Sequence, residues 1–419
     1  MWETSAIVAV GDEVLTGEVL NTNGAFIGQA LLAAGSRVTR QILVPDDEQA
    51  IRDTLLQAWE SVDLVVMVGG LGPTPDDRTR NGVAAALGVE MAVDAELEAR
   101  VRARHSSHPG SEDSIRRQSL VLDTAMVLPN NVGTAPGQLL IRQEKAVALL
   151  PGPPWECRDV ADSLMKEVER RTGRRIVRAT WRCYGMAESE FAHHLGDLLT
   201  SPALRAGVYV RPGVVELRLE AALGDDAEKT RELLARAGAL ARARVPLPLY
   251  DDAVPITPKR LIEALALRGE TLSLAESLTG GMLAAELTAI AGASSVVLDG
   301  QVVYTDEAKV RLGIDPRLLQ TAGAVSEPVA RSLAELSRLR AGATWGLGLT
   351  GYAGPSGGTK SDPVGTYYCA VAGPSGTVVH RRRTRSGREV VRLAAAETAR
   401  FLLARELVTG PNLDSEDDR

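Results

Sequence analysis

The sequence predicts an α/β protein with two larger α/β domains and a small α+β module between them. Strand-like apolar runs alternate with helical patterns of about 10–15 residues in both halves of the chain, which indicates βαβ units and parallel sheets. With 419 residues, of which 45% are hydrophobic and 24% charged, the chain is long enough for two to four globular domains. A charged stretch at 170–178 and a proline-containing stretch at 251–258 separate the predicted domains.

The first domain is predicted at residues 1–172 and consists of short buried strands and amphipathic helices. Its glycine-rich segments follow strands, which is where parallel sheets bind ligands. A closing helix is expected to end near residue 171. In chain order we expect a strand at 6–10, a helix at 22–34, a strand at 38–44, a helix at 48–59, a strand at 64–68, a helix opening at 80–87 and a strand at 146–150.

The middle module is predicted at 173–254, with strands at 208–210 and 214–219 and a helix at 227–241. The last domain is predicted at 255–410, and the polar, acidic segment 411–419 is expected to be disordered. The elements expected in the last domain are helices at 259–267, 282–289, 306–312, 327–338 and 388–407, and strands at 271–275, 296–304, 345–349, 366–371 and 377–383.

Composition disfavours several classes of protein. No apolar run reaches the roughly 18 residues of a membrane-spanning helix, and the first residues lack the basic region of a signal peptide. Three widely separated cysteines do not form a disulfide framework or a CxxC zinc site and fit a reducing compartment. A net charge of −7 disfavours nonspecific DNA binding, and no GxxxxGK[ST] or HExxH motif occurs. We therefore expect a cytoplasmic protein without a membrane or nucleic-acid partner.

Ser277 is the candidate nucleophile of the last domain. It lies between the strand 271–275 and a helix that opens with Gly280 and Gly281. A hydroxyl at the carboxyl end of a strand lies next to free backbone N–H groups, which stabilise an oxyanion. The two glycines permit close approach of a phosphate. The alternative is that Ser277 or Thr279 serves only as a helix N-cap.

Lys309 is the candidate general base. Only six of the 47 basic residues are lysines, and arginine serves equally well where only surface charge is needed. Lys309 lies in the first turn of a predicted helix, where the positive helix end favours the neutral amine that a base requires. Tyr304, at the end of the preceding strand, is a candidate for assisting it. The alternative is a surface lysine paired with Asp306 or Glu307.

A glycine-rich loop at 350–358 follows the strand 345–349 and is typical of a ligand-facing loop. The segment 346–351 matches GxGxxG, but its glycines fall within the strand and no helix follows, so we reject a dinucleotide fingerprint. Arg388 and Arg392, one turn apart at the start of the final helix, can neutralise a phosphate or a carboxylate. The alternative for these arginines is a solvated helical face.

Carboxylates follow two strands of the first domain. Asp12 and Glu13 come after 6–10, and Asp76 and Asp77 lie in the loop after 64–68. Four carboxylates at adjacent strand ends suit Mg²⁺ or a similar hard cation that holds a diphosphate. The alternative is a set of N-caps and Asx turns. Groups expected to bind ribose or phosphate oxygens are Asn21, Asn23, Gly70, Gly72 and Thr74.

Taken in order, these motifs resemble the CinA (competence/damage-inducible) family over nearly the whole chain. Residues 133–137 and 150–154, with the acidic and glycine-rich segments above, resemble its N-terminal MoaB/MogA-like domain, a three-layer α/β/α fold. The middle segment resembles its KH-like connecting domain. The segments that resemble its C-terminal amidase domain are 275–281, 304–309, 323–328, 351–358 and 363–366.

The resemblance implies two activities in a homodimer that salvages pyridine nucleotides. The last domain would hydrolyse the carboxamide of nicotinamide mononucleotide to nicotinate mononucleotide and ammonia without a cofactor, with Ser277 as nucleophile, Lys309 as base and Tyr304 assisting. The first domain would cleave ADP-ribose to AMP and ribose 5-phosphate with a divalent metal at Asp12, Glu13, Asp76 and Asp77. Substrate contacts in the last domain would come from Thr279, Gly280, Gly281, Thr350, Gly351, Ala353, Gly354 and Arg388.

Two alternatives remain open. One is a nucleotide- or pterin-binding regulatory protein of competence or DNA-damage response, without turnover in the first domain. The other is molybdopterin processing by the first domain, which rests on fold analogy alone. RNA binding by the middle module is disfavoured, because the turn 211–214 reads RPGV rather than the GXXG of RNA-binding KH domains.

Overall fold

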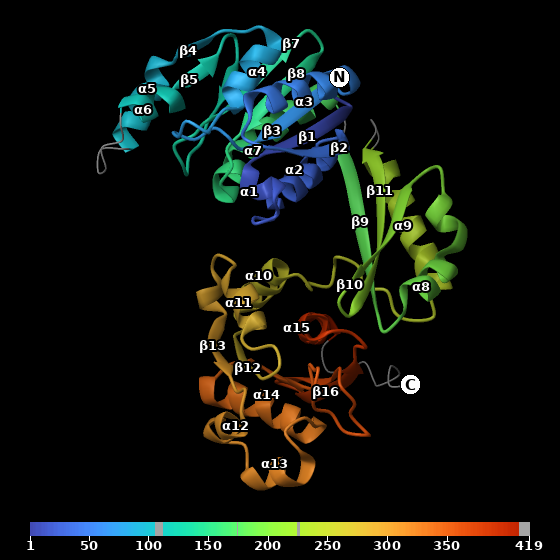
Figure 1. Ribbon diagram of the computed structural model, residues 1–419. Coiled ribbons are helices and arrows are strands. Elements are labelled where there is room, and N and C mark those ends of the chain that lie inside the picture. The colour runs from blue at the N-terminus through green and yellow to red at the C-terminus, as the bar shows by residue number, and fades with distance from the viewer. Residues whose placement is uncertain (105–111, 174, 224–226, 410–419) are drawn as a thin grey trace. The chain divides into compact units, whose positions relative to one another are not determined.

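The computed structural model describes residues 1–104, 112–173, 175–223 and 227–409, and it confirms the α/β fold class (Figure 1). The chain forms two compact units, Met1–Val177 with Ala221–Glu232, and Arg178–Glu220 with Leu233–Arg419. The acidic segment 411–419, for which the sequence predicts disorder, lies outside the described residues.

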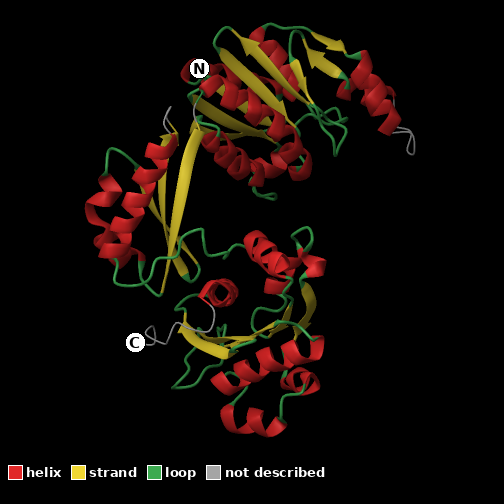
Figure 2. Cartoon of the chain, turned by 180° about the vertical axis from the view of Figure 1, so that it is seen from behind, coloured by secondary structure: helices red, strands yellow, loops and turns green. Residues whose placement is uncertain are grey.

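The first unit contains a six-stranded sheet with helices on both faces (Figure 2). Four neighbouring strands are parallel, and two further strands extend the sheet in antiparallel pairs. The order is β2 (Arg37–Val44), β1 (Thr4–Val10), β3 (Leu64–Val68), β8 (Lys145–Leu150), β7 (Gly137–Arg142) and β6 (Met126–Leu128).

Alternation along β1 explains the three layers of this unit. Side chains of a strand point to opposite faces in turn, so Ile7 lies in one core cluster and Ala6 and Val8 lie in another. Ile7 packs with residues of α2 and α7, whereas Ala6 and Val8 pack with residues of α3 and α4. The bounds are α2 (Thr22–Ala33), α7 (Pro154–Thr172), α3 (Glu48–Ser61) and α4 (Thr79–Leu87).

Several short elements of the first unit are absent from the sequence prediction. The strands β4 (Met91–Val93) and β5 (Leu120–Leu122) form an antiparallel pair, and α1 (Asp12–Leu15) follows β1 directly. Strands of three residues and a helix of four are too short to show a hydrophobic period. The helices near the β4–β5 pair are α5 (Ala95–Arg104) and α6 (Glu112–Gln118).

A module with a three-stranded sheet lies mostly in the second unit, which holds Arg178–Glu220 and Leu233–Arg419. Its order is β10 (Arg205–Arg211), β11 (Val214–Leu223) and β9 (Arg175–Tyr184), and the strand β9 is absent from the sequence prediction. Gly213 forms the tight β10–β11 turn with a φ of 83°, a conformation that favours glycine. The helical elements of the module are α8 (Glu188–Leu195), the short 3₁₀ segment Gly196–Thr200 and α9 (Ala227–Arg244).

A five-stranded sheet forms the rest of the second unit. Three parallel strands are followed by an antiparallel pair, in the order β13 (Val297–Val302), β12 (Leu272–Glu276), β14 (Trp345–Gly351), β15 (Thr366–Gly373) and β16 (Gly376–Arg383). One face packs against α10 (Pro258–Arg268), α11 (Met282–Thr288) and α15 (Arg388–Thr409), and the other against α14 (Glu327–Ala341). The short helices α12 (Asp306–Leu312) and α13 (Pro316–Ala322) lie between β13 and α14 in the chain.

The glycines of the GxGxxG-like segment allow α14 to approach the sheet closely. A Cβ atom on Gly346 or Gly348 would lie within 3.0 Å of the backbone of α14, at Ala334 and Ala330 respectively. These glycines therefore serve helix–sheet packing, which supports the rejection of a dinucleotide fingerprint.

Replacement of Gly348 by alanine is expected to lower the free energy of unfolding by about 1–3 kcal/mol, because the added methyl group overpacks a close backbone contact. Urea denaturation of the whole chain measures the change. Gly387→Ala is the matched control, because a Cβ atom there meets nothing within 4 Å. Equal stability of both variants and the wild type would contradict this account of Gly348.

Candidate active site of the second unit

The ends of three parallel strands bring the predicted catalytic segments to one edge of the sheet. Glu276, the last residue of β12, lies opposite Val302 of β13 and Leu349 of β14. Just beyond, the Ser277 amide donates to the Leu349 carbonyl at 3.0 Å, and the Val303 amide donates to the Glu276 carbonyl at 2.8 Å. The register thus brings the residues that follow the three strands, from Ser277, from Tyr304 and from Thr350, to the same edge.

Ser277 lies in a tight turn between β12 and α11 and is 7% exposed. Its carbonyl accepts from the Gly280 amide at 3.1 Å. Gly280 and Gly281 have φ angles of 63° and 88°, so both occupy the left-handed region that other residues rarely adopt. The two glycines let the chain reverse direction between β12 and α11 and hold Ser277 at the turn.

Glu276, which the sequence analysis did not select, caps α11. It is 1% exposed, and its carboxylate accepts from the amides of Leu283 at 3.1 Å and Ala284 at 2.8 Å. The expectation that the first N–H groups of α11 are free to stabilise an oxyanion is therefore wrong for these two amides. In the sequence, Glu276 stands seven residues before Leu283, the first residue whose amide it caps. This spacing is longer than that of a capping box, so the pattern did not reveal the cap.

Two arginines at the start of α15 connect the loops at this edge. Arg392 donates from Nε to the carbonyl of Leu278 at 3.0 Å and from Nη2 to the carbonyl of Thr279 at 2.7 Å. Arg388 donates to the Gly354 carbonyl at 2.8 Å and to the Tyr304 hydroxyl at 2.7 Å. One helix end thus holds the loops after β12, β13 and β14, which a solvated helical face would not do.

Lys309 is buried, with only 2% of its surface exposed. Burial lowers the pKa of its ammonium group, and Asp306, whose Oδ1 lies 3.7 Å from Nζ, opposes that shift only in part. The sequence attributed the neutral lysine to the helix N-terminus, whereas the largest cause in the structure is loss of solvent. Asp306 pairs with Lys309, as the alternative expected, but the lysine side chain is buried and does not lie on the surface.

Tyr304 has 54% of its surface exposed, and its hydroxyl oxygen accepts the hydrogen bond from Arg388. The hydroxyl thus remains accessible to solvent and to a ligand, while Arg388 fixes its position.

The other residues that were predicted to contact the substrate lie in the loops or in the core of the second unit. Thr279 is fully buried, and its Oγ1 has no hydrogen-bond partner among the described residues. Thr350 donates its hydroxyl to the Ala324 carbonyl at 2.8 Å, and Ala353 packs in the hydrophobic core, so both have structural roles here. Gly351 lies against Tyr367 and Leu278, where a Cβ atom would come within 3.0 Å of either side chain.

Candidate nucleotide site of the first unit

The glycine-rich loop after β3 is organised by Asp77. Its Oδ1 accepts from the Gly72 amide at 2.7 Å, and its Oδ2 accepts from the Thr74 amide at 2.8 Å and the Thr74 hydroxyl at 2.5 Å. Both carboxylate oxygens of Asp77 therefore accept hydrogen bonds from its own loop. This agrees with the Asx-turn alternative and not with a free metal ligand. Gly70, with a φ of 63°, lies against the Thr79 hydroxyl.

The other acidic residues lie close to one another at the strand ends. Burial raises the pKa of Asp46, and the charges of Glu13, Asp12 and Asp76 raise it further. The Asp46 carboxylate also accepts from the Asp12 amide at 3.2 Å. Sequence reasoning missed Asp46, although it follows β2 just as Asp12 follows β1. Carboxylates that repel one another are a donor set that fits a hard cation.

The coordination geometry of a metal site is not preformed. Within the described residues, no group of three or more His, Cys, Asp or Glu side chains converges closely enough to hold an ion. The carboxylates would have to rotate toward one another to coordinate one.

The two asparagines predicted to bind a ligand have partners within the protein. Asn21 caps α2, and its Oδ1 accepts from the Gly24 amide at 2.8 Å. Asn23 donates from Nδ2 to the Gly152 carbonyl at 2.7 Å. The N-cap alternative therefore describes Asn21, and Asn23 joins the start of α2 to the loop after β8.

Arg80 is a further residue that the sequence analysis missed. It is 3% exposed beneath the glycine-rich loop and donates from Nη2 to the Leu71 carbonyl at 3.0 Å. Burial lowers its pKa to about 10, and the charge of Asp77 opposes that shift. A buried guanidinium of this kind stabilises the loop from below.

Comparison with known proteins

Three family models match consecutive parts of the chain. They are described as "Probable molybdopterin binding domain" at residues 6–170, "Damage-inducible protein CinA KH domain" at 178–250 and "CinA C-terminal domain" at 256–407. A CinA-like protein of Anaeromyxobacter dehalogenans (strain 2CP-C) is 38% identical over 407 residues, which are 95% of this chain and 98% of that protein. The chain belongs to the CinA family.

A second curated relative supports the same family. A CinA-like protein of Frankia casuarinae is 36% identical over 97% of this chain and 96% of its own length. The crystal structure of the protein CinA with unknown function from Thermoplasma acidophilum is 33% identical and covers 40% of this chain and 98% of that chain, with a TM-score of 0.38. None of the described helices has the length and apolar character needed to span a bilayer.

Proposed function

We propose that the second unit hydrolyses the carboxamide of nicotinamide mononucleotide, giving nicotinate mononucleotide and ammonia. The observation that carries this proposal is the buried Lys309, whose lowered pKa favours the neutral amine. Its helix α12 packs with residues at the ends of β12 and β13, through Ala275 and Val303. A lysine with a lowered pKa on a helix that packs at the strand end bearing Ser277 fits a nucleophile–base arrangement.

The proposed reaction uses groups of this chain only. Ser277 Oγ attacks the carboxamide carbon and its proton passes to Lys309, with Tyr304 assisting. Collapse of the tetrahedral intermediate returns the proton to the leaving nitrogen and releases ammonia, which leaves an ester on Ser277. Water, deprotonated by the same lysine, cleaves the ester and gives the carboxylate product. One amide and one water thus yield one acid and one ammonia.

Ammonia release from nicotinamide mononucleotide tests the proposal. Wild type is expected to release ammonia, and Ser277→Ala is expected to lower kcat by at least about 1,000-fold, because the ester intermediate cannot form. Ser295→Ala is the matched control, since Ser295 is exposed and its hydroxyl bonds only to the Gly292 carbonyl at 2.9 Å. No release by well-folded wild type between mildly acidic and mildly alkaline pH would refute the proposal.

We also propose that the first unit cleaves the diphosphate of ADP-ribose to AMP and ribose 5-phosphate. What supports this is the position of Asp46 beside a glycine-rich loop, where burial and the charges of Glu13, Asp12 and Asp76 raise the pKa of its carboxyl. These carboxylates would hold a divalent cation, which when bound supplies positive charge at the diphosphate oxygens. The protein's own part is to orient the phosphates by N–H groups of the loop at 69–77 other than those of Gly69, Gly72, Thr74 and Asp77, which donate within the protein.

The metal requirement gives a direct test of the second activity. AMP formation from ADP-ribose is expected to stop with a chelator and to return with Mg²⁺. Asp46→Asn is expected to reduce it at least about tenfold, because one carboxylate of the set is lost. Asp53→Asn is the control, because Asp53 is exposed on α3 and contacts only Gln49 in the described structure. Binding of ADP-ribose without turnover would favour the regulatory alternative.

We further propose that the CinA chain is a homodimer, as its family resemblance implies. Sedimentation equilibrium of the full chain, at 44.5 kDa per copy, distinguishes a dimer from a monomer.

A further inference from the structure

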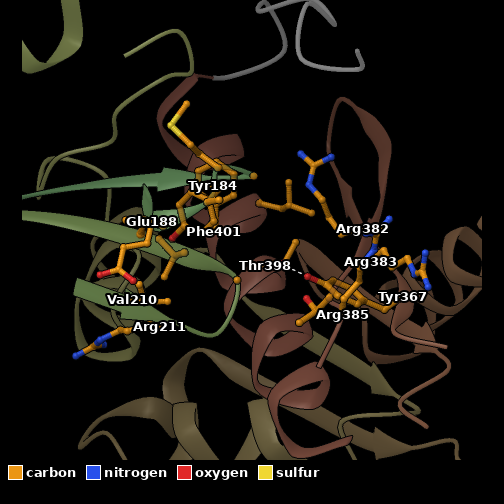
Figure 3. A pocket seen from close by; sticks show the side chains of 18 residues that line it. Tyr184, Glu188, Val210, Arg211, Tyr367, Arg382, Arg383, Arg385, Thr398 and Phe401 are labelled. Atoms are coloured by element: carbon orange, nitrogen blue, oxygen red, sulfur yellow. Dashed lines mark hydrogen bonds between the residues drawn. The ribbon is translucent and has the colours of Figure 1, made fainter. Parts of the chain in front are cut away.

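A cavity of about 440 Å³ opens in the second unit, away from the candidate active site (Figure 3). It is lined by the segment after β9, by the β10–β11 turn, and by residues of β15, β16 and α15. The KH-like module and the amidase-like domain thus both contribute to it. Its volume falls within the roughly 300–1,000 Å³ of sites for small molecules.

Aromatic side chains hold the two parts together beside this cavity. The Tyr184 ring stacks on Phe401 of α15, with centroids 3.9 Å apart, and the Tyr184 hydroxyl donates to Glu397 at 2.9 Å. Tyr367, from β15, is hydrogen-bonded to Thr398 at 3.1 Å. These rings are fixed by their partners, so the cavity has a preformed apolar and aromatic wall.

Arginines dominate the charge of the lining. Arg382, Arg383 and Arg385 lie on one side of the cavity, and Arg211 lies on the opposite side with Glu188, the only acidic residue of the lining (Figure 3). The structure shows for Arg382 and Arg383 only long hydrogen bonds, to the carbonyls of Arg381 at 3.5 Å and Val364 at 3.4 Å.

The charge of the 382–385 side is uncompensated. No described carboxylate lies within ion-pair distance of Arg382, Arg383 or Arg385. Arg211, by contrast, lies 3.8 Å from the buried Glu216. Three unpaired guanidinium groups beside a fixed aromatic wall form a site for an anion attached to a ring, because guanidinium binds phosphate by paired hydrogen bonds and rings pack on aromatic faces.

We propose that this cavity binds a nucleoside monophosphate, with the phosphate at Arg382, Arg383 and Arg385 and the base or sugar against the aromatic wall. The site is separate from the candidate amidase site, because Ser277, Tyr304 and Lys309 do not line it. The proposal does not depend on either proposed activity.

Calorimetric titration of the full chain with AMP tests the proposal, with inorganic phosphate and adenosine as half-ligands. AMP is expected to bind more tightly than phosphate, and its affinity is expected to fall as salt is raised. The double variant Arg383→Gln/Arg385→Gln is expected to raise the Kd of this site by about 100-fold, about tenfold for each lost charge-assisted contact. Arg317→Gln, an exposed arginine on α13, is the matched control.

Two further variants keep the outcome unambiguous. Arg388→Gln alters the candidate amidase site, and Asp46→Asn alters the candidate site of the first unit. Both variants are expected to bind AMP at the cavity as the wild type does. Thermal unfolding of every variant verifies the fold. Equal AMP binding by wild type and the double variant would overturn the proposal. Loss of binding in Arg388→Gln or Asp46→Asn alone would also overturn it, as would binding of a single-stranded oligonucleotide without binding of AMP.

Discussion

Lys309→Arg is expected to reduce ammonia release from nicotinamide mononucleotide by about 1,000-fold, within the 100- to 10,000-fold range of general-base catalysis. A guanidinium stays protonated at any working pH and therefore cannot accept the Ser277 proton. Lys309→Met, of similar length and neutral, is expected to lose as much. Similar rates for Lys309→Met and wild type would remove Lys309 from the mechanism.

The pH profile of the wild type identifies the same group. Burial lowers the pKa of Lys309 from its usual 10.5, so kcat/KM is expected to rise with pH and level off below pH 10.5. Between the folded and the unfolded pKa the unfolded chain binds more protons at this site, so stability rises with pH there. Lys309→Met is expected to show neither the rise of kcat/KM with pH nor this rise of stability with pH.

Glu276→Ala is expected to lower the free energy of unfolding of the second unit by about 3–5 kcal/mol, because the amides of Leu283 and Ala284 lose their acceptor in the protein interior. Where the chain still folds, ammonia release is also expected to fall, because Ser277 follows Glu276 directly. Denaturation by urea and the amidase assay together measure the two effects.

Glu276→Gln separates the two effects. Its amide oxygen retains one of the two backbone hydrogen bonds, so we expect a smaller loss of stability and a partial recovery of activity. Glu263→Ala, on the exposed face of α10, is the control and is expected to change stability by less than about 0.5 kcal/mol. If Glu276→Ala is as stable as this control, the capping role is wrong.

The fold class and the candidate catalytic segments could be predicted from the sequence. The apolar run of β3 and the alternation of strands with helices indicate a parallel sheet. Ser277, Tyr304 and Thr350 were each expected at or just after the end of a strand, and the register of the three parallel strands brings them to one edge. The strands β4, β5, β6, β7 and β9 were missed. The strands β4, β5 and β6 have three residues each, too few to show a hydrophobic period, and β9 carries arginine at three of its ten positions.

The roles of individual polar groups could not be predicted, because they depend on contacts between residues far apart in the chain. Nothing near Arg388 in the sequence indicates that it binds Tyr304 and Gly354. Asp76 and Asp77 are neighbours, yet only Asp77 turns both oxygens into its own loop. Burial, which sets the pKa of Lys309, is likewise a property of the packed helix and not of its sequence.

The sequence by itself determined many of the longer helices and strands, the strand-end positions of the candidate site residues and the CinA resemblance, because these depend on local pattern and spacing. Only the tertiary structure decided that Glu276 caps α11 and that Arg392 holds the Ser277 turn. It alone joined Tyr184 to Phe401 and so formed the arginine-lined cavity. The physical reason is that hydrogen bonds, burial and cavities arise when distant segments pack, and a linear pattern does not specify the partner.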